Sequence, residues 1–353
     1  MSLTDKPMTC TTAARLRVAA LTQGMRVPST RFRVEQHIED LSRLGIDVDH
    51  QPARYGAYPP DGTLQRVGWL PRAVADAARR AWRANDADVC LLQRELVSTL
   101  HTAERLIRRP VVLDVDDAVF LHKRGRLVDS IARRAALIIC GNSFLADHFS
   151  ALGPVAILPT AVDASRFVPV PAAADTTRPV IGWSGSSSGF AYLESIQEPL
   201  RIVLEHFPDA IFSVIADRAP TLPMLPAKQL RFTRWQAETE VQGLQSFTIG
   251  IMPLSDTPWS RGKCSFKMLT YMAVGVPVVV SPVGMNREVL ALGDCGLAAT
   301  STDEWVDALT TLLFDRQRSS DMGKTGRRIV ELNFSQDVIT PRLAALLRNV
   351  GER

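Results

Sequence analysis

The segment GKCSFKMLTYMAVGVPVVVSPVGMNREV, residues 262 to 289, contains a helix, a strand and the start of a second helix in succession. Ser265 can cap a helix over 266–273, and a glycine turn at 275–277 leads into the apolar strand VVVSP. Gly284 then opens the next helix at the carboxyl end of that strand. This succession indicates a parallel sheet with crossover helices.

Two lysines stand beside the start of the first of these helices. Lys263 and Lys267 are one turn apart, and a helix N-terminus adds free amide groups and the positive end of the helix dipole. Together with Ser265, these groups predict a binding site for a diphosphate. Asn286 and Glu288 begin the next helix and are candidates for the same site. The alternative is that any crossover unit of this kind has a capped helix, a glycine turn and exposed lysines.

Short β-branched runs alternate with helical patterns in both halves of the chain. The predicted strands are at residues 16–22, 46–50, 88–93, 111–115, 136–140, 180–185, 211–216, 247–254 and 276–282. Near-continuous apolar strands separated by helices predict an α/β protein with two Rossmann-like, doubly wound parallel sheets. We expect an N-terminal domain over 1–170, a linker over 171–179 and a C-terminal domain over 180–334. The last residues, 335–353, are expected to form a helix that packs back toward the N-terminal domain.

The composition is that of a globular protein with more than one core. The chain has 353 residues, of which 46% are hydrophobic and 22% charged. Its longest apolar stretches are too short and too rich in proline and glycine to span a bilayer, and its N-terminus lacks an apolar signal core. The five cysteines show no paired spacing, so neither a disulfide framework nor a zinc site is expected. These features predict a cytoplasmic protein.

The excess of positive charge lies in the N-terminal half. Residues 1–170 contain 23 of the 41 basic and 18 of the 37 acidic side chains, which leaves 18 and 19 for the rest of the chain. Much of the excess falls in two helix-like segments, 70–86 and 122–135. In the first, four arginines flank three large apolar residues; they are Arg72, Arg79, Arg80 and Arg83 beside Trp69, Val74 and Trp82. The pattern fits a solvated face over a packed stripe or contact with an anionic membrane surface. No motif for nucleic-acid binding accompanies it.

The segment 262–289 resembles the donor-binding core of GT-B glycosyltransferases of family four, whose members read close to GFxxxxLEAMAxGxPVVxSxxGGxxEV. The similarity continues through RFTRWQAETEVQGLQSFTIGIMPLSDTPW and VIGWSGSSSG in the same domain. In the first domain STRFRVEQHIEDLSRLGIDV, RPVVLDVDDAVF and GNSFLADHFSALGPVAILPTAVDASRF resemble the acceptor half. The resemblance covers nearly the whole chain and implies two Rossmann-like domains facing each other across a cleft.

The resemblance implies a retaining transfer of a hexose-type sugar from a nucleotide diphosphate sugar, as co-substrate, to a hydroxyl acceptor. The helix N-termini and the lysines would stabilise the departing diphosphate, so that neither a metal nor another cofactor is expected. Acceptor binding would belong to the first domain, where Arg31 and Arg33 are candidates to bind anions, with solvent exposure as the alternative. If the basic surface is functional, the acceptor is a glycan or lipid-linked saccharide used in surface polysaccharide assembly at the inner face of the cell membrane.

Two departures from the family pattern leave a second interpretation open. The family carries two glutamates eight positions apart, and the matching positions here are Gly262 and Thr270. It also tends to have Arg and Lys after the first strand of the C-terminal domain, where this chain has the serine-rich run 184–188. Arg261 is a further candidate for the missing cation. A degenerate member that binds a nucleotide sugar or a glycan without catalysing transfer is therefore the alternative.

Three carboxylates end the apolar run of RPVVLDVDDAVF, residues 109 to 120. A haloacid-dehalogenase-type phosphatase would use Asp114 as nucleophile and Asp116 as acid/base with magnesium, but no adjacent pair of aspartates follows later in the chain. A metal-binding Asp-x-Asp belongs to a single-domain glycosyltransferase fold, which two sheets contradict. The resemblance places Asp116 and Asp117 beside the reacting sugar, where Asp116 would orient or deprotonate the acceptor hydroxyl. Asp114 is expected to cap a turn or to pair with an arginine such as Arg94.

Further donor contacts are expected from loops at strand ends. Gly24 follows the first strand, where it would let the backbone approach the donor phosphates, and Gly185 and Ser186 belong to the glycine loop of the second domain. Thr270 occupies the position at which the family binds the ribose. Trp235 follows a predicted strand and would either stack on the nucleobase or be a buried core residue.

Overall fold

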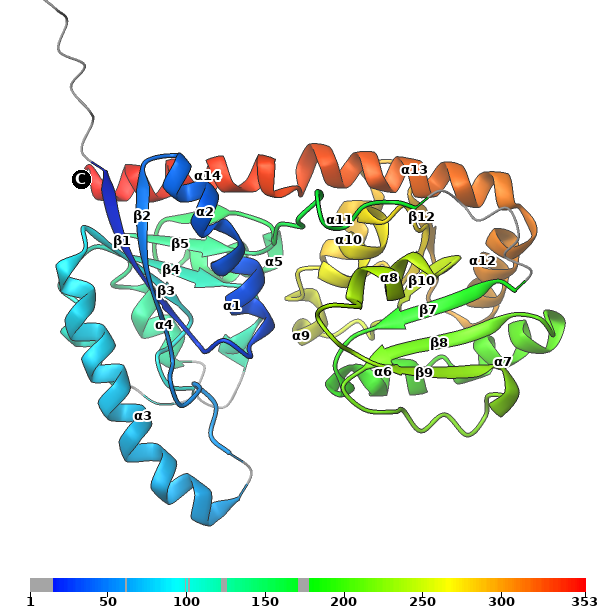
Figure 1. The fold of residues 1–353 in the computed structure, drawn as a ribbon, viewed down its shortest axis with the longest axis horizontal. Coiled ribbons are helices and arrows are strands. Elements are labelled where there is room, and N and C mark those ends of the chain that lie inside the picture. Colours follow the sequence, from blue (N-terminus) through cyan, green and yellow to red (C-terminus); the bar gives the residue numbers. More distant parts are fainter. Residues whose placement is uncertain (1–14, 61, 99, 101, 122–125, 171–177) are drawn as a thin grey trace, which may run out of the picture.

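The computed structural model describes residues 15–60, 62–98, 100, 102–121, 126–170 and 178–353. Its elements form two α/β domains side by side, joined along one edge by the last two helices of the chain (Figure 1). Most of the predicted linker, 171–177, and part of the second basic segment, 122–125, lie outside the described residues. None of the described helices is long and apolar enough to cross a bilayer.

The N-terminal domain is built on a parallel sheet of six strands in the order β2-β1-β3-β4-β5-β6. The strands are β1 (Leu16–Thr22), β2 (Ile46–Pro52), β3 (Val89–Gln93), β4 (Val111–Val115), β5 (Leu137–Cys140) and β6 (Val155–Ile157). The helices are α1 (Pro28–Arg33), α2 (Ile38–Arg43), α3 (Thr63–Arg83), α4 (Arg126–Ala132) and α5 (Ser143–Ser150), with the 3-10 turns η1 (Glu35–His37), η2 (Ala84–Asp86), η3 (Glu104–Leu106) and η4 (Val119–Leu121). The central strands β3 and β4 are buried along almost their whole length, because helices cover both faces of the sheet.

The C-terminal domain contains a second six-stranded parallel sheet, in the order β12-β11-β10-β7-β8-β9. Its strands are β7 (Val180–Ser184), β8 (Ile211–Ala216), β9 (Leu230–Arg234), β10 (Ile249–Met252), β11 (Val278–Val280) and β12 (Gly296–Ala298). Its helices are α6 (Phe190–Glu194), α7 (Gln197–His206), α8 (Glu240–Gln245), α9 (Pro258–Arg261), α10 (Phe266–Ala273), α11 (Met285–Leu290), α12 (Thr302–Phe314) and α13 (Arg316–Asn333), with the 3-10 turns η5 (Ser187–Gly189) and η6 (Ala227–Gln229). Two doubly wound parallel sheets confirm the predicted fold class.

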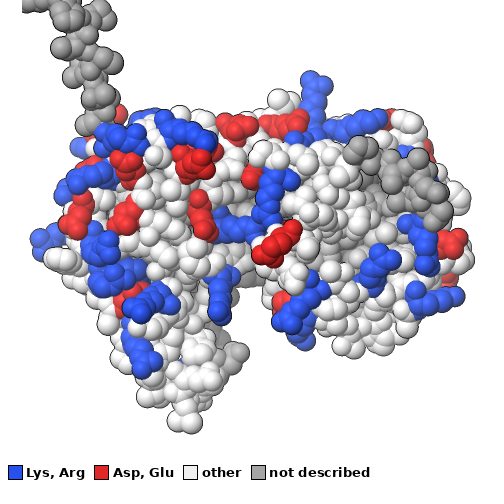
Figure 2. Space-filling view, in the orientation of Figure 1, with Lys and Arg blue, Asp and Glu red and all other residues white. Residues whose placement is uncertain are grey.

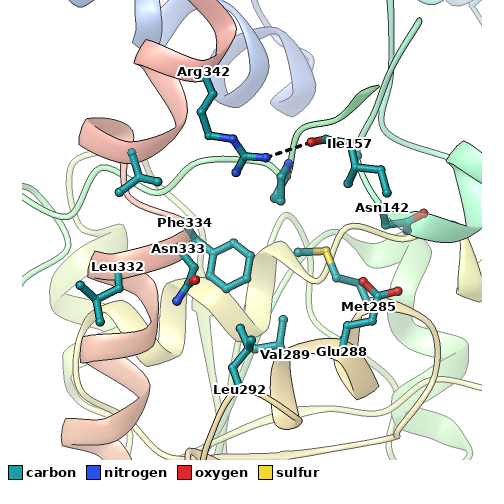
Figure 3. A pocket seen from close by; sticks show the side chains of 13 residues that line it. Asn142, Ile157, Met285, Glu288, Val289, Leu292, Leu332, Asn333, Phe334 and Arg342 are labelled. Atoms are coloured by element: carbon teal, nitrogen blue, oxygen red, sulfur yellow. Dashed lines mark hydrogen bonds between the residues drawn. The ribbon is translucent and has the colours of Figure 1, made fainter. Parts of the chain in front are cut away.

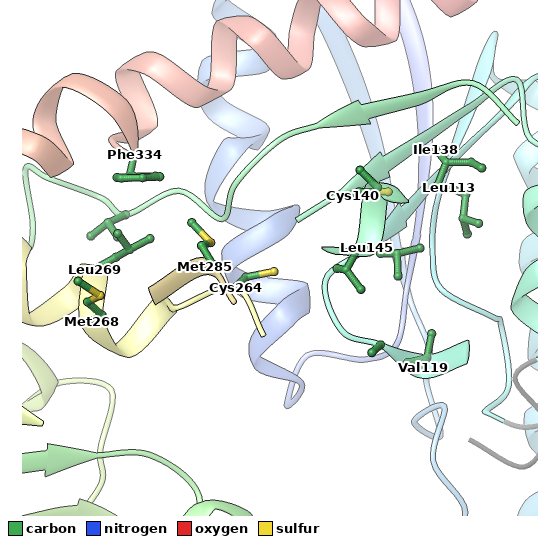
Figure 4. Close-up of a cluster of buried hydrophobic side chains, with 14 of the residues drawn as sticks. Leu113, Val119, Ile138, Cys140, Leu145, Cys264, Met268, Leu269, Met285 and Phe334 are labelled. Atoms are coloured by element: carbon green, nitrogen blue, oxygen red, sulfur yellow. The ribbon is translucent and has the colours of Figure 1, made fainter. Parts of the chain in front are cut away.

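The last helix, α14 (Gln336–Gly351), leaves the C-terminal domain and lies on the N-terminal sheet (Figure 1). Leu343 and Leu347 pack in one buried cluster with Val18 and Leu41 of the N-terminal domain. Another cluster of buried apolar side chains continues from one domain into the other, and Figure 4 shows Cys140 and Leu145 on one side of it and Cys264 and Met285 on the other. The domains therefore bury apolar surface against each other, and the chain passes between them twice, before β7 and again at α14.

The sequence predicted that the large apolar residues of α3 pack on the domain and that its arginines flank them, and the structure shows a different arrangement. Arg80, predicted to flank the stripe, is buried and donates to the carbonyl oxygens of Thr22 and Gln51, at 3.1 and 3.2 Å. The side of α3 that packs on the domain carries alanines, namely Ala73, Ala77, Ala81 and Ala84. Trp82, by contrast, is 70% exposed. The small alanines let the helix approach the sheet closely, which leaves the larger apolar residues on its outer side.

Candidate active site

The carboxyl ends of β3 and β4 bring together a cationic side chain and two carboxylates. Arg94, directly after β3, donates from Nε to Asp116 Oδ1 at 2.8 Å and from Nη2 to Asp117 Oδ2 at 2.7 Å. Its Nη1 also donates to the hydroxyl of Tyr58 at 3.1 Å, and that hydroxyl donates to Gln23 at 2.8 Å. We call Arg94, Asp116, Asp117 and Tyr58 the Arg94 cluster. Parallel strands place such groups at one edge of the sheet, where ligands of open α/β folds bind.

Arg94 has a backbone conformation that is rare for its residue type. Its φ is 56°, in the left-handed region, and its amide donates to the carbonyl of Asp114 at 3.0 Å. A side chain with a Cβ is disfavoured in this region, so the surrounding structure must hold Arg94 there, and such strain concentrates at functional sites. The sequence prediction considered Arg94 only as a partner for Asp114, and the structure gives it to Asp116 and Asp117 instead.

The two carboxylates of the Arg94 cluster differ in their ease of ionisation. Burial opposes the charge on Asp116, but attraction by Arg94 and Arg33, together with hydrogen bonds from Ser29 and Arg94, outweighs it and lowers the pKa of Asp116. Burial raises the pKa of Asp117, since attraction by Arg94 is partly offset by repulsion from Asp116. The side chain of Asp117 is also the more accessible, at 30% against 12%. Asp117 is therefore better placed than Asp116 to accept a proton from a bound molecule.

Asp114 and Arg33 form an ion pair beneath this cluster. Both side chains are buried, with Arg33 Nε donating to Asp114 Oδ2 at 3.2 Å and Arg33 Nη1 donating to the carbonyl of Leu158 at 2.7 Å. The predicted role of Arg33 in acceptor binding is wrong, because its donors are directed into the core. The same burial removes the phosphatase alternative, since Asp114 is not accessible to a phosphate ester.

The lysines of the C-terminal domain lie at the start of α10, beside aromatic rings. Lys267 Nζ lies 5.6 Å from the centroid of Trp183, and Lys263 Nζ lies 5.5 Å from that of Trp259. Burial, together with repulsion from Lys263, lowers the pKa of Lys267 to about 8. Gly185 leaves room for this arrangement, because a Cβ there would meet Lys267 Cε at 2.4 Å. We call Lys263 and Lys267 the lysine pair.

Three predicted donor contacts hold the backbone in place and do not face an open site. Ser265 occupies the N-cap position but has a φ of 51°, and its hydroxyl donates to Asn286 Oδ1 at 2.6 Å without capping α10. Asn286 is fully buried and donates to the carbonyl of Ser281 at 3.0 Å. Thr270 is buried and donates to the carbonyl of Lys267 at 2.8 Å. The left-handed backbone turns the Ser265 side chain away from the helix amides, so the predicted capping role is wrong.

The serine-rich loop after β7 is held by Asp217. Ser187 donates to this carboxylate through its amide, at 2.6 Å, and its hydroxyl, at 2.8 Å. Ser186 is exposed, and its hydroxyl lies 2.7 Å from that of Ser188. Gly24, in the N-terminal domain, has a φ of 123°, a conformation that favours glycine. Both predicted backbone loops are therefore present at strand ends.

A polar contact between the two domains is centred on Glu240 of the C-terminal domain. Arg31 donates to Glu240 Oε2 at 2.9 Å, and Trp235 Nε1 donates to Oε1 at 3.3 Å. Arg31 therefore joins the two domains, and its charge is already paired. Trp235 is 39% exposed, which excludes the alternative of a buried core residue. Glu240 was not identified from the sequence, where nothing distinguishes it from other glutamates in the region.

The segment before α10 lies directly against the DVDD segment of the other domain. Asn142 Nδ2 donates to the carbonyls of Arg261 and Lys263, at 3.1 and 3.0 Å, and the Cys264 thiol donates to the carbonyl of Asp116 at 3.1 Å. A Cβ on Gly262 would lie 2.6 Å from the Cβ of Ala118 and 2.9 Å from its amide nitrogen. The position at which the family carries its first glutamate has no space for a side chain in this arrangement.

A cavity of about 300 Å³ lies elsewhere along the domain junction (Figure 3). Met285 and Phe334 line it together with Glu288, and Arg342 on its wall donates to the carbonyl of Ile157 at 3.2 Å. The carboxylate of Glu288 accepts a hydrogen bond from Ser143 of the N-terminal domain. None of the Arg94 cluster or the lysine pair lines this cavity. Among the residues that the structure describes, no group of three or more His, Cys, Asp and Glu side chains is arranged to hold a metal ion.

Comparison with known proteins agrees with this arrangement. Residues 178–315 match a family model described as glycosyl transferases group 1. The fold is similar to that of sucrose-phosphate synthase from Thermosynechococcus elongatus, with a TM-score of 0.73 at 15% identity over 95% of this chain and 99% of that one. It is also similar to HepE from Anabaena, solved in complex with UDP and glucose, with a TM-score of 0.70 at 15% identity over 95% and 100% of the two chains. No curated protein matches the chain. The predicted GT-B fold is thus confirmed, as is the resemblance to group 1 glycosyltransferases over the C-terminal domain.

Proposed function

We propose that this chain, whose residues 178–315 match glycosyl transferases group 1, is a retaining glycosyltransferase that moves a sugar from a nucleotide diphosphate sugar to a hydroxyl acceptor. One observation carries the proposal. Cys264, which directly follows Lys263 of the lysine pair, donates from its thiol to the carbonyl of Asp116 at 3.1 Å, so the C-terminal domain contacts the N-terminal domain right beside Asp117. A site for a polyanion and a site for a proton acceptor therefore adjoin each other at the domain junction.

The lysine pair would bind the diphosphate of the donor and stabilise the charge that develops on it as the glycosidic bond breaks. The amides at the start of α10 would add to this stabilisation. Because both charges come from the protein, the reaction in this proposal does not depend on a metal ion. Trp235 is accessible to stack on a nucleobase, and HepE is a neighbour solved with UDP and with UDP-glucose. UDP-glucose is therefore the first donor to test.

The Arg94 cluster would act on the acceptor. Asp117, with its raised pKa and greater exposure, would accept the proton of the attacking hydroxyl, while Asp116 keeps its charge and holds Arg94. Their position in the N-terminal domain fits an acceptor bound by that domain. We propose a glycan or a lipid-linked saccharide as acceptor, in surface polysaccharide assembly, with the protein in the cytoplasm and at the inner face of the membrane. The excess of basic residues in the N-terminal half supports this location.

The test is transfer or hydrolysis measured with a panel of UDP, GDP, ADP and CMP sugars. Turnover of one donor, lost in Asp117→Asn with donor binding retained, is the expected result. Donor binding by the intact protein without turnover of any donor or acceptor would contradict the proposal and support the degenerate binding protein. That second candidate is favoured by one observation, the absence of side-chain carboxylates at Gly262 and Thr270.

A further inference from the structure

Helix α3 exposes a row of large apolar side chains to solvent. Leu64 is 91% exposed, Val67 is 72% exposed, and Val74 and Trp82 are exposed as well. The spacing of these residues places them on one side of a helix. Figure 1 shows the first turns of α3 extending beyond the sheet, and Figure 2 shows a largely uncharged tip with basic side chains around its base. Single exposed apolar residues are ordinary, but several on one side of a projecting helix mark an interaction surface.

A set of arginines lies at the other end of the same helix. The turn η3 packs against α3, where Asn85 donates to the carbonyl of Leu106 at 3.0 Å, and Leu106 is itself half exposed. Beside this turn is a cavity of about 450 Å³ with four arginines on its wall, which are Arg105, Arg108, Arg109 and Arg134. Glu104 also lines the cavity, but its carboxylate already accepts from the amides of Leu96 and Thr102, at 3.0 and 2.9 Å. Arg109 Nε donates to the carbonyl of Asn85 at 2.9 Å. The four guanidinium groups make the lining of the cavity cationic.

We propose that α3 and η3 form a docking surface for an anionic lipid bilayer. The apolar row enters the interface between headgroups and acyl chains, and the arginine-lined cavity binds lipid phosphates. An amphipathic helix with large apolar residues on one side and arginines beside them has the chemistry of an interfacial helix. Basic side chains close to an anionic leaflet add to the attraction.

The combination of the two features selects a bilayer over other partners. A nucleic acid would use the arginines but would leave the apolar row in water. A second copy of the chain would bury the apolar row but would bring the arginines of two molecules together. An anionic lipid surface satisfies both parts at once, because it offers acyl chains to the apolar row and phosphates to the arginines.

The position of α3 connects this surface to the Arg94 cluster. The segment between β2 and α3 contains Tyr58, a member of that cluster, and Tyr55, whose carbonyl accepts from Trp69 Nε1 at 2.9 Å. Arg66 Nε donates to the carbonyl of Pro60 at 2.7 Å, which adds a second link between the helix and this segment. Docking through α3 would therefore bring a lipid-linked acceptor close to the cluster. This last step rests on the proposed function, whereas docking itself does not.

The experiment is co-sedimentation of the full-length protein with vesicles of phosphatidylcholine alone or mixed with phosphatidylglycerol. Binding is expected only to the anionic vesicles, and added salt should weaken it. The double variants Leu64→Ser/Val67→Ser and Arg105→Ser/Arg134→Ser should each lower the partition coefficient about tenfold or more. The control variants Phe314→Ser/Leu332→Ser and Arg231→Ser/Arg328→Ser change exposed residues of the same kinds in the C-terminal domain and should bind as the unchanged protein does.

Three results would overturn docking. The first is that the protein does not bind anionic vesicles, and the second is that the control variants lose as much vesicle binding as the test variants. The third is that the protein forms dimers or nucleic-acid complexes through these residues and does not bind vesicles. Thermal unfolding of each variant shows whether it is folded. Turnover of UDP-glucose with a soluble acceptor is measured in parallel, so that failure of the enzymatic proposal is seen separately from failure of docking.

Discussion

Lys267 carries its charge in a position where burial works against it. Its pKa is lowered to about 8, so the side chain is mostly protonated at neutral pH and loses its charge as the pH rises through 8. Affinity for a nucleoside diphosphate should therefore fall between pH ~7 and ~9, while affinity for the nucleoside stays level. Calorimetric titration measures both. Lys267→Ala should bind the diphosphate more weakly at every pH and lose this pH dependence, and an unchanged profile in the variant would contradict the assignment.

Gly262 is a residue at which restoring the family pattern should be harmful. A Cβ there meets the side chain and backbone of Ala118, so Gly262→Ala and Gly262→Glu should both lower the free energy of unfolding, by about 1–3 kcal/mol. Both variants should also turn over more slowly, because the segment before α10 can no longer lie against Asp116 and Ala118. Gly68→Ala is the matched control, since nothing lies within 4 Å of a Cβ there. Faster transfer by Gly262→Glu would show that the domains open enough to admit a carboxylate.

At this scale the sequence predicts the position of a polar residue better than the direction of its side chain. Asp116 and Asp117 were predicted at the carboxyl end of a strand, where the structure places them. Arg94 has the same position after β3, but its left-handed backbone and its two carboxylate partners have no signal in the sequence. The burial of Arg33 and Asn286 likewise depends on contacts made by residues far along the chain.

The elements of the fold were predictable for a different reason. Helices cover both faces of strands such as β3 and β4, so nearly every residue of these strands is buried. Such strands are recognisable in the sequence as short apolar runs. Helix faces are harder to predict, as α3 shows. Its alanines face the sheet and its larger apolar residues face solvent, although hydrophobicity alone favours the opposite arrangement. Which side of a helix packs depends on how closely the neighbouring strands must be approached.

The start of α5 has a residue that serves two elements at once. Asn142 Oδ1 caps the helix by accepting from the amide of Leu145 at 2.9 Å, while its Nδ2 bonds to the carbonyls of Arg261 and Lys263 in the other domain. Asn142→Asp keeps the cap but removes both donated bonds and places a carboxylate against two carbonyls. Loss of the two hydrogen bonds between the domains should cost ~1–2 kcal/mol, and turnover should fall about tenfold as a result.

Small-angle scattering gives a second readout for this pair of roles. Asn142→Asp should enlarge the radius of gyration, because the domains are held less closely, with the unfolding of the N-terminal domain little changed. Asn142→Ala should lose the cap as well and destabilise α5 by about 1 kcal/mol. Equal behaviour of the two variants would mean that capping alone explains the residue.

At the scale of the whole molecule, α14 holds the two domains together, and a buried histidine lies in its contact with the N-terminal domain. His37 Nδ1 lies 2.7 Å from the hydroxyl of Thr340 on α14, and the two side chains are buried beneath the helix. Because α14 continues from the C-terminal domain, its contact with the N-terminal domain limits how far the domains separate. A charge on His37 would have to be accommodated in this apolar contact, beside Arg33. Burial, aided by repulsion from Arg33, accordingly lowers the pKa of His37 to about 3.

Because the pKa of His37 is lower in the folded than in the unfolded protein, the folded protein loses stability as the pH falls. An unfolded histidine binds a proton near pH 6.5, whereas folded His37 stays neutral until about pH 3, so its contribution to stability is complete above pH 6.5 and is lost as the pH falls toward 3. The free energy of unfolding in urea should therefore decrease over this range, by up to ~1.4 kcal/mol per pH unit from this group. His37→Gln keeps a polar partner for Thr340 without a titrating ring, so it should flatten the decrease. His206→Gln changes an exposed residue at the end of α7 and should leave the decrease unchanged, and equal slopes in both variants would assign the acid sensitivity to other groups.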